Sequence, residues 1–233
     1  MKKWGYFNRL MLNKASLSRV LTEIELEHVY KTIFPSIQVS KVLVAGGGLK
    51  SRGSEHVLLD LIDNKKSCLF ADINRFRNPN IIADLGSIWS FRNEAFDLIL
   101  STWVIEHIIS PTNFFIEAFR TLRRKGVFVC SVPFIQRKHG SPHDYYRFTD
   151  MSLSSLASSA GFKHIEIRPV GGKPFVCCIS LLWPLFPFPL IGLILFLLAW
   201  IFDVIYKAAA KMFGKRGEIL NSYPINYILI GIK

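Results

Sequence analysis

The chain has 233 residues, of which 50% are hydrophobic, and it carries a formal net charge of +12. This length suffices for one full core with an appendage but excludes two large independent domains, and the hydrophobic share is too low for a protein of many membrane spans. The positive charge indicates an acidic partner or surface, and nucleic acid and anionic lipid are the two common ones. Four cysteines lack the spacing of metal ligands, which favours reduced core thiols.

Helices and strands are predicted to alternate along the chain. Apolar residues at helical spacing predict a helix over 16–33, and the apolar run at 41–48 predicts a strand that enters a glycine turn. A helix with Ser54 as its N-cap follows over 54–63. The later elements are strands at 67–73, 80–85 and 96–102, a helix at 111–124, a strand at 126–134, a helix at 151–160, and strands at 162–170 and 223–233. This alternation predicts an α/β fold with a mostly parallel sheet covered on both faces.

Signals of a ligand site stand at the ends of the first three predicted strands. Gly46, Gly47 and Gly48 allow the backbone to approach a nucleotide closely, because no Cβ stands in the way and positive φ is free. Asp72 ends the second strand, where a carboxylate can accept both hydroxyls of a ribose, and Asp84 ends the third, where it can meet an adenine amine. The alternative for each aspartate is an Asx turn or a helix cap.

From Val42 to about Phe162, the order of motifs resembles that of class I S-adenosylmethionine-dependent methyltransferases of the type 11-like group. The resemblance rests on VLVAGGG, FADI, IIADL, FDLILSTWVIEHIISP and EAFRTLRRKGVFVCSVPF. The stretch HGSPHDYYRFTDMSLSSLASSAGF is similar to that of a subgroup often encoded with cell-surface polysaccharide functions. The resemblance implies a Rossmann-like sheet of seven strands, here with a hydrophobic helical insertion before the last strand, and S-adenosyl-L-methionine as the cofactor.

The resemblance also implies a cofactor site at the ends of the first four strands. Its residues are Gly46, Gly47 and Gly48 for the methionine moiety, Asp72 and Ile73 for the ribose, Asp84 and Leu85 for adenine, and Ser101 and Thr102 beside the cofactor. Two positions depart from the family pattern. Val44 stands where an acidic residue is usual, and Lys50 stands where a third glycine is usual, for which Gly53 is the substitute candidate.

Candidate catalytic and substrate-binding residues lie in the loops after the fourth and fifth strands. A methyl transfer to a hydroxyl needs a base, for which His107, and His143 with Asp144 as its neighbour, are the candidates. Their alternative is structural, with His107 only packing beneath the cofactor. Candidate substrate contacts are His139, Tyr145, Tyr146 and Arg147, since tyrosines and an arginine suit a sugar or a phosphate. The alternative is a structural lid in which Arg147 pairs with a nearby carboxylate and the aromatic rings fill the core.

Two other chemistries are disfavoured by the sequence. His139 and His143 have helical spacing, but Gly140 and Pro142 between them make a helix improbable, so we expect no metal site. A hydride-transferring Rossmann enzyme would carry a glycine where Ser51 stands.

Residues 175–202 carry no charge, although they lie between the last two predicted strands. Because those strands pair in this fold, one membrane crossing would separate them, and two crossings need roughly forty apolar residues. We therefore expect a helical hairpin that enters and leaves the same leaflet, broken by the prolines at 184, 187 and 189. The alternative is a dimer interface or a cover for the sheet.

These features predict three regions: a basic amphipathic helical segment at 1–35, a methyltransferase domain at 36–170 and 223–233, and a hydrophobic membrane-associating insertion at 171–222. Residues 1–20 and 175–216 are expected to contact an anionic membrane surface at the cytoplasmic face, and a homodimer is an open alternative. No nucleic acid is expected, since the charge accompanies long apolar runs. The predicted function is O-methylation of a lipid-linked saccharide or other lipid-like acceptor. A degenerate, non-catalytic membrane scaffold with the same fold is the alternative.

Overall fold

The computed structural model describes residues 16–36, 39–50, 53–62, 68–140, 143–171, 173–186, 188–212 and 222–233. Residues 1–15 of the predicted basic segment lie outside this part of the chain. The chain divides into two compact units. The larger comprises 25–133, 138–168 and 227–233, and the smaller comprises the described residues among 1–24, 134–137 and 169–226. The region boundaries predicted from the sequence stay predictions.

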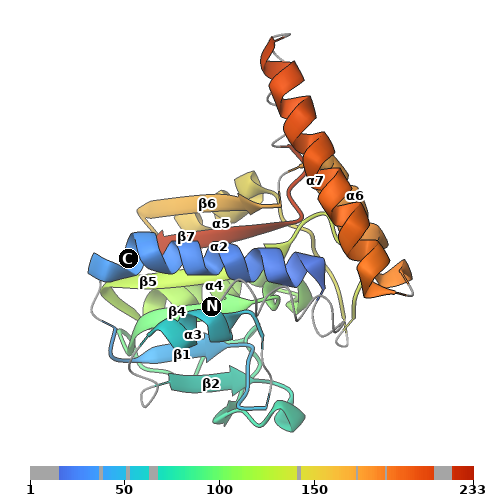
Figure 1. The fold of residues 1–233 in the computed structure, drawn as a ribbon. Helices are drawn as coiled ribbons and strands as arrows, with labels where there is room; N and C mark the ends of the chain where they lie inside the picture. Colours follow the sequence, from blue (N-terminus) through green and yellow to red (C-terminus); the bar gives the residue numbers. More distant parts are fainter. Residues whose placement is uncertain are drawn as a thin grey trace. The chain divides into compact units, whose positions relative to one another are not determined.

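A seven-stranded sheet has the order β3-β2-β1-β4-β5-β7-β6 (Figure 1). Its strands are β1 Val42–Ala45, β2 Cys68–Asp72, β3 Ile81–Ile82, β4 Phe96–Thr102, β5 Leu122–Pro133, β6 His164–Val170 and β7 Asn226–Ile232. The pairs among β1 to β5 are parallel. β7 runs antiparallel to β5, since Lys233 N donates to Gly126 O, and Lys125 N to Lys233 O, at one end, while Phe134 N donates to Ile225 O at the other. The predicted Rossmann-like, seven-stranded fold is confirmed.

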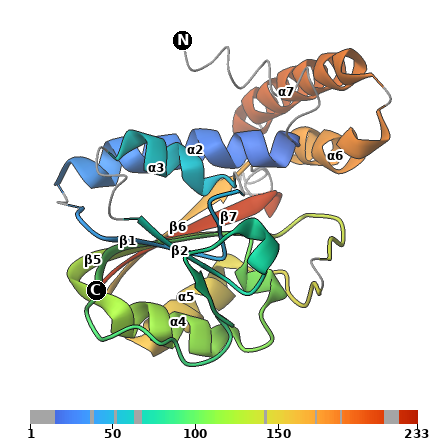
Figure 2. The same ribbon diagram turned by 90° about the horizontal axis from the view of Figure 1, so that it is seen from below.

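The central strands are buried on both faces, which explains why they read as continuous apolar runs. All four residues of β1 are buried, and so are the last eight of β5. Figure 2 shows α3 and α2 on one side of the sheet and α4 and α5 on the other. The helix bounds are α2 Leu17–Ile33, α3 Glu55–Leu61, α4 Pro111–Thr121 and α5 Asp150–Ala160, with short 3₁₀ helices η1 Phe34–Ser36, η3 Arg75–Arg77 and η4 Ile105–His107.

Two local predictions differ from the structure. The helix expected to end at residue 124 ends at Thr121, because Leu122 is already extended and fully buried at the start of β5. Gly126 then follows Lys125, whose φ is +63°, and a Cβ at Gly126 would lie only 2.8 Å from Arg123 O. Ser54 precedes α3 as predicted, but its side chain makes no capping hydrogen bond.

The hydrophobic insertion forms two helices, α6 Pro174–Leu182 and α7 Pro189–Met212, with η5 Trp183–Leu185 after the first. Asp203 of α7 is 1% exposed, and it accepts hydrogen bonds from Phe175 N at 3.2 Å and Val176 N at 2.9 Å at the start of α6. The carboxylate thus satisfies amides that the first turn of a helix leaves free. By length and composition, the Leu190–Ala209 stretch, with a mean hydropathy of 2.1, is the one helix in the described part of the chain that could cross a membrane.

A partly buried ion pair fixes the loop before β4 to α4. Arg120 donates to both oxygens of Glu117, at 2.9 and 2.7 Å, and Trp89 N donates to Glu117 Oε2 at 2.7 Å. Arg120 also donates to the carbonyls of Phe91 and Trp89. The hydrogen bonds from Arg120 hold the pKa of Glu117 below its usual range, although burial opposes this shift.

We expect Glu117→Gln to lower the free energy of unfolding by about 2 kcal/mol at pH 7, because a buried charged hydrogen-bond network loses its acceptor. A carboxylate whose pKa is lowered in the folded state stabilises the fold above its unfolded pKa and stops doing so as the pH falls through the folded pKa. The difference between wild type and variant should therefore shrink below about pH 4.5. Urea unfolding in one detergent at several pH values measures this. Glu94→Gln, at a side chain 50% exposed, is the control, and an equal loss there would contradict the prediction.

Candidate functional site

The turn after β1 needs glycine because the chain packs closely against it. Gly46 has φ +93°, and a Cβ there would lie 2.2 Å from Val104 Cγ2. A Cβ at Gly48 would lie 2.2 Å from Arg77 O, and one at Gly47 would lie 2.7 Å from Val44 Cγ1. Any larger residue at these three positions would therefore strain the fold, so the turn depends on glycine.

Glu55, in the first turn of α3, places a buried carboxylate beside the glycine turn. The residue is 3% exposed, and its Oε1 lies 3.6 Å from the Cβ position of Gly47. Thr102 Oγ1 donates to Glu55 Oε2 at 2.5 Å, and Gly53 N donates to Oε1 at 3.1 Å. Sequence reasoning missed this residue. Since Val44 replaces the acid usual in β1, an acidic residue close behind the glycine turn was the available signal.

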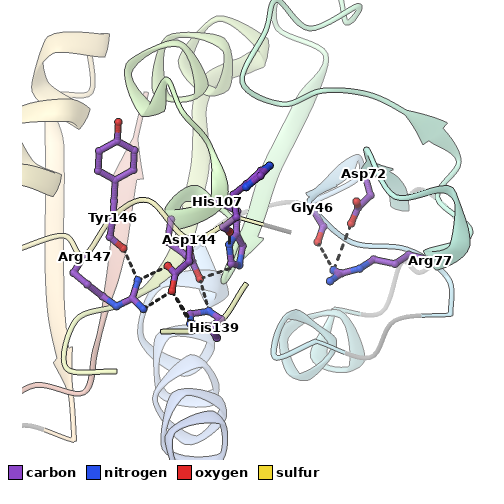
Figure 3. Close-up of polar contacts among 10 residues, drawn as sticks. Gly46, Asp72, Arg77, His107, His139, Asp144, Tyr146 and Arg147 are labelled. Atoms are coloured by element: carbon purple, nitrogen blue, oxygen red, sulfur yellow. Dashed lines mark hydrogen bonds and ion pairs between the residues drawn. The ribbon is translucent and has the colours of Figure 1, made fainter. Parts of the chain in front are cut away.

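Asp72 and Arg77 lie together at the end of β2 (Figure 3). Asp72 is 6% exposed, and its Oδ1 accepts a hydrogen bond from Asn74 N at 2.8 Å, as in an Asx turn. Arg77 Nη1 lies 3.5 Å from Asp72 Oδ2 and donates to Gly46 O at 3.5 Å. The arginine therefore bridges the two places that a nucleoside-bearing cofactor would contact. The neighbouring Ile73 is 65% exposed.

The remaining predicted cofactor residues lie at the ends of β3 and β4. Asp84 is exposed and forms its own turn, accepting from Gly86 N at 2.9 Å and Ser87 Oγ at 2.8 Å. Leu85 is buried. Ser101 is 1% exposed, and its hydroxyl has no hydrogen-bond partner among the residues that the structure describes. A buried orphan hydroxyl next to Thr102 marks a place where a ligand atom can be bound.

A second cluster joins the loop after β4 to the loop after β5. Glu106 is fully buried, and His107 Nε2 and His139 Nε2 lie 3.8 and 3.5 Å from its Oε1. Tyr145 N donates to Glu106 O at 2.8 Å, and the ring Nδ1 of His107 is hydrogen-bonded to His143 O. These bonds fasten the HDYYRFT segment to η4.

Arg147 donates two hydrogen bonds to the carboxylate of Asp144, from Nη1 to Oδ1 at 2.5 Å and from Nη2 to Oδ2 at 2.7 Å (Figure 3). These hydrogen bonds hold the pKa of Asp144 well below its usual range and raise the pKa of Arg147. Asp144 Oδ2 also accepts from His139 N at 2.8 Å. Of the candidate substrate contacts, Arg147 is therefore engaged within the protein. Tyr145 and Tyr146 are 44% and 36% exposed.

Asp144 and His143, predicted as neighbours in catalysis, have different partners in the structure. Asp144 contacts His139, while the ring of the exposed His143 lies against Tyr145, with 5.4 Å between ring centroids. The expected pairing of Asp144 with the His143 ring is not among the contacts of the described residues. Tyr146 Oη donates to Ile109 O at 2.8 Å, which adds another bond between the two loops.

Comparison with known families and structures is consistent with this arrangement. Residues 48–130 match a protein family described as a methyltransferase domain, whereas no curated protein matches the chain. The match and the fold together confirm the predicted class I S-adenosylmethionine-dependent methyltransferase domain, with S-adenosyl-L-methionine as its cofactor. The likeness of residues 139–162 to the polysaccharide-associated subgroup stays a prediction.

Solved structures share the fold at low sequence identity. A SAM-dependent methyltransferase from Archaeoglobus fulgidus is 13% identical, with a TM-score of 0.55, and the alignment covers 91% of this chain and 94% of that one. The [4+2]-cyclase SpnF is 15% identical, with a TM-score of 0.56 and coverages of 90% and 80%. Phosphoethanolamine N-methyltransferase 2 from Haemonchus contortus, in complex with S-adenosyl-L-methionine, is 13% identical, with a TM-score of 0.53 and coverages of 90% and 52%. These likenesses establish the fold.

We expect Asp144→Asn to loosen the segment from His143 to Phe148, because the charged acceptor of Arg147 and of the His139 amide is lost. Hydrogen exchange should become at least about tenfold faster at the amides of Tyr145 and Tyr146, the difference that a local destabilisation of about 1.4 kcal/mol produces. Asp150→Asn, an exposed carboxylate in the same region, is the control. Unchanged exchange in Asp144→Asn would show that backbone bonds to Glu106 hold the segment alone.

Proposed function

We propose that this protein transfers a methyl group from S-adenosyl-L-methionine to an oxygen of a lipid-linked saccharide or another lipid-like acceptor, at the cytoplasmic face of a membrane. The observation that carries the enzymatic part is the glycine turn with two acids, Glu55 and Asp72, at one edge of the sheet, within and beside the segment that matches the methyltransferase domain. The membrane part rests on the apolar surface of α7.

The residues at this edge fit the cofactor. The Glu55 carboxylate near Gly47 suits the ammonium group of a methionine moiety. The Asp72 carboxylate suits ribose hydroxyls once the side chain of Arg77, which is 39% exposed, moves away from it. The orphan hydroxyl of Ser101 supplies a further polar contact. When bound, the cofactor supplies a methyl group on a sulfonium, so the protein's part is to align an acceptor and to remove its proton.

The loops joined at Glu106 supply the residues for the acceptor. His107 and His143 are the candidate bases in the proposal, and Asp144 and Arg147 position the segment that carries His143. Tyr145 and Tyr146 expose ring surface on which a sugar can stack. His139 belongs to the same cluster through Asp144 and Glu106.

The exposed surface of α7 supports contact with lipid. Its buried side is narrow and includes Ala199 and Asp203, and no charged residue occurs from Leu190 to Phe202. From Leu190 to Ile205 the exposed side chains are apolar: Leu190, Ile191, Ile194, Leu197, Leu198, Trp200, Ile201, Phe202, Val204 and Ile205. An apolar surface of this extent is unusual on a soluble monomer, so a membrane or a protein must cover it. Lys173, whose ammonium lies 5.6 Å from the Trp200 ring centroid, fits a headgroup boundary.

Strand order supports a hairpin that stays in one leaflet. β6 leads into the insertion and β7 leads out of it, and these strands are neighbours in the sheet. A full crossing by α7 would need a second helix of about twenty residues for the return. The apolar helical stretch Pro174–Leu185 spans only about 18 Å at 1.5 Å per residue, against about 30 Å of hydrocarbon.

Binding of S-adenosyl-L-methionine to the detergent-solubilised full chain, measured by calorimetry, tests the enzymatic part. We expect micromolar affinity, weakened tenfold or more, or about 1.4 kcal/mol, in Asp72→Ala. Arg77→Ala should bind at least as tightly as wild type, because it frees Asp72 from a competing cation. Asp60→Ala, at an exposed acid of α3, is the control. No binding by folded protein would favour the alternative of a membrane scaffold without catalysis.

Extraction of membranes with salt and with carbonate tests the membrane part. We expect wild type to resist both treatments, and Ile194→Lys with Ile201→Lys to be released, because two charges then face hydrocarbon. Ile88→Lys, at an 86% exposed side chain outside the insertion, is the control and should stay bound. Release of wild type by salt alone would contradict the embedded hairpin. If the released protein were a dimer, the apolar face of α7 would be a protein interface.

A further inference from the structure

We propose that Glu106, His107 and His139 form a binding site for a divalent transition-metal ion, with Zn²⁺ as the ion that the donor set favours. The candidate ligand atoms, one from each residue, all lie within 4.8 Å of one another. This inference does not rest on the proposed function, because it concerns ion binding by the protein alone. It assigns His107 to the metal, which leaves His143 as the candidate base.

The first observation is the state of the Glu106 carboxylate. The residue is fully buried, and neither carboxylate oxygen accepts a hydrogen bond from the residues that the structure describes. A buried carboxylate without donors is costly, and buried charges are normally paired or bound to a metal. The atoms that face Glu106 Oε1 most closely are the Nε2 atoms of the two imidazoles, which are themselves metal-binding atoms.

The second observation is how the two histidines are held. The Nδ1 atom of His107 is hydrogen-bonded to His143 O, which makes Nδ1 the protonated nitrogen and leaves a lone pair on Nε2 when the ring is neutral. On His139, Nδ1 lies 3.5 Å from Asp144 Oδ2, while Nε2 points toward Glu106. A carbonyl or a carboxylate behind the far ring nitrogen is how metal-binding histidines are usually oriented.

The spacing of the donors suits a small ion. Two atoms bound tetrahedrally at about 2.1 Å lie roughly 3.4 Å apart. The distances from Glu106 Oε1 to the two imidazoles, 3.5 and 3.8 Å, are close to this value. Two nitrogens and one oxygen favour Zn²⁺ and its neighbours over Mg²⁺ or Ca²⁺. The side chains of His107 and His139 are 17% and 27% exposed, whereas the Glu106 side chain is fully buried.

The sequence disfavours a metal on a different pair, His139 and His143, which would face one ligand only from a helix, and residues 138–140 and 143–149 are not helical. The structure instead brings His139 to Glu106 and His107, which lie more than thirty residues earlier and on another loop. The adjacent pair of a glutamate and a histidine after β4, followed by a histidine after β5, is therefore the relevant pattern.

Metal content and Co²⁺ spectroscopy of the full chain, purified in detergent through a tag without histidines, test the proposal. We expect about one equivalent of Zn²⁺ after dialysis against excess Zn²⁺ and then buffer, and visible d–d bands on Co²⁺ substitution. Glu106→Gln, His107→Asn and His139→Asn should each bind Zn²⁺ at least about tenfold more weakly and lose the Co²⁺ bands, since each removes one of three ligands. His164→Asn, at an exposed histidine of β6, should match wild type.

Two controls keep the outcome decisive. Circular dichroism checks that each variant is folded, and X-ray absorption on wild-type protein reports the ligands even if a variant fails to fold. Zinc bound through two imidazoles and a carboxylate supports the proposal. Absence of stoichiometric Zn²⁺ would overturn it and leave a metal-free cluster of carboxylate and imidazoles. Equal affinity in wild type and all folded variants would also overturn it, because the ion would then be bound elsewhere.

Discussion

Parallel pairing of β1 with β2 and with β4 is the constraint on which the rest of the structure depends. Val44 pairs with Phe70 on one side and Leu100 on the other, so the three strands end at nearly the same level. The glycine turn, the Asp72 carboxylate and the Thr102 hydroxyl then emerge at one edge of the sheet, where α3 adds Glu55. Because β5 continues the register, pairing Ser131 with Thr102, the loop that carries His139 starts from the same edge. The parallel pairing of these strands therefore brings residues that are far apart in the sequence to the same edge of the sheet.

Two buried carboxylates at this edge of the sheet differ in their hydrogen bonding. Glu55 accepts hydrogen bonds on both oxygens, from Thr102 and Gly53, so its charge is compensated by the fold itself. Glu106 accepts none from the described residues, although its backbone carbonyl accepts two, from Tyr145 and Tyr146. The fold itself therefore supplies donors that position the Glu55 carboxylate beside the glycine turn, whereas the proposed metal would complete the Glu106 carboxylate. Asp144 is a third case, since Arg147 neutralises it and thereby fixes the ring of His139.

The fold was predictable from the sequence, whereas most of the site was not. Strands such as 96–102 are short apolar runs between polar turns, and their period and alternation with helices suffice to predict a parallel sheet. The role of Glu106 depends on where two loops meet, which no local pattern reports, whereas Glu55 had a local signal in its position close behind the glycine turn. Arg77 reaches Asp72 from the 3₁₀ turn η3 between β2 and β3, a contact that the sequence pattern does not indicate. The Asp144 and Arg147 pair was anticipated as the structural alternative for Arg147, since an arginine three residues from an aspartate can fold back on it.

The insertion shows how strand order limits what a hydrophobic segment can do. By composition alone, α7 is long enough to cross a bilayer. Its ends, however, are tied through β6 and β7 to neighbouring places in one sheet, and α6 is too short to provide a return crossing. Asp203 adds a second restriction, because a buried carboxylate that caps α6 fixes α7 beside α6 in a hairpin. A hairpin whose outer face is apolar and whose one acid is internally satisfied is what the proposed contact with a membrane interface requires.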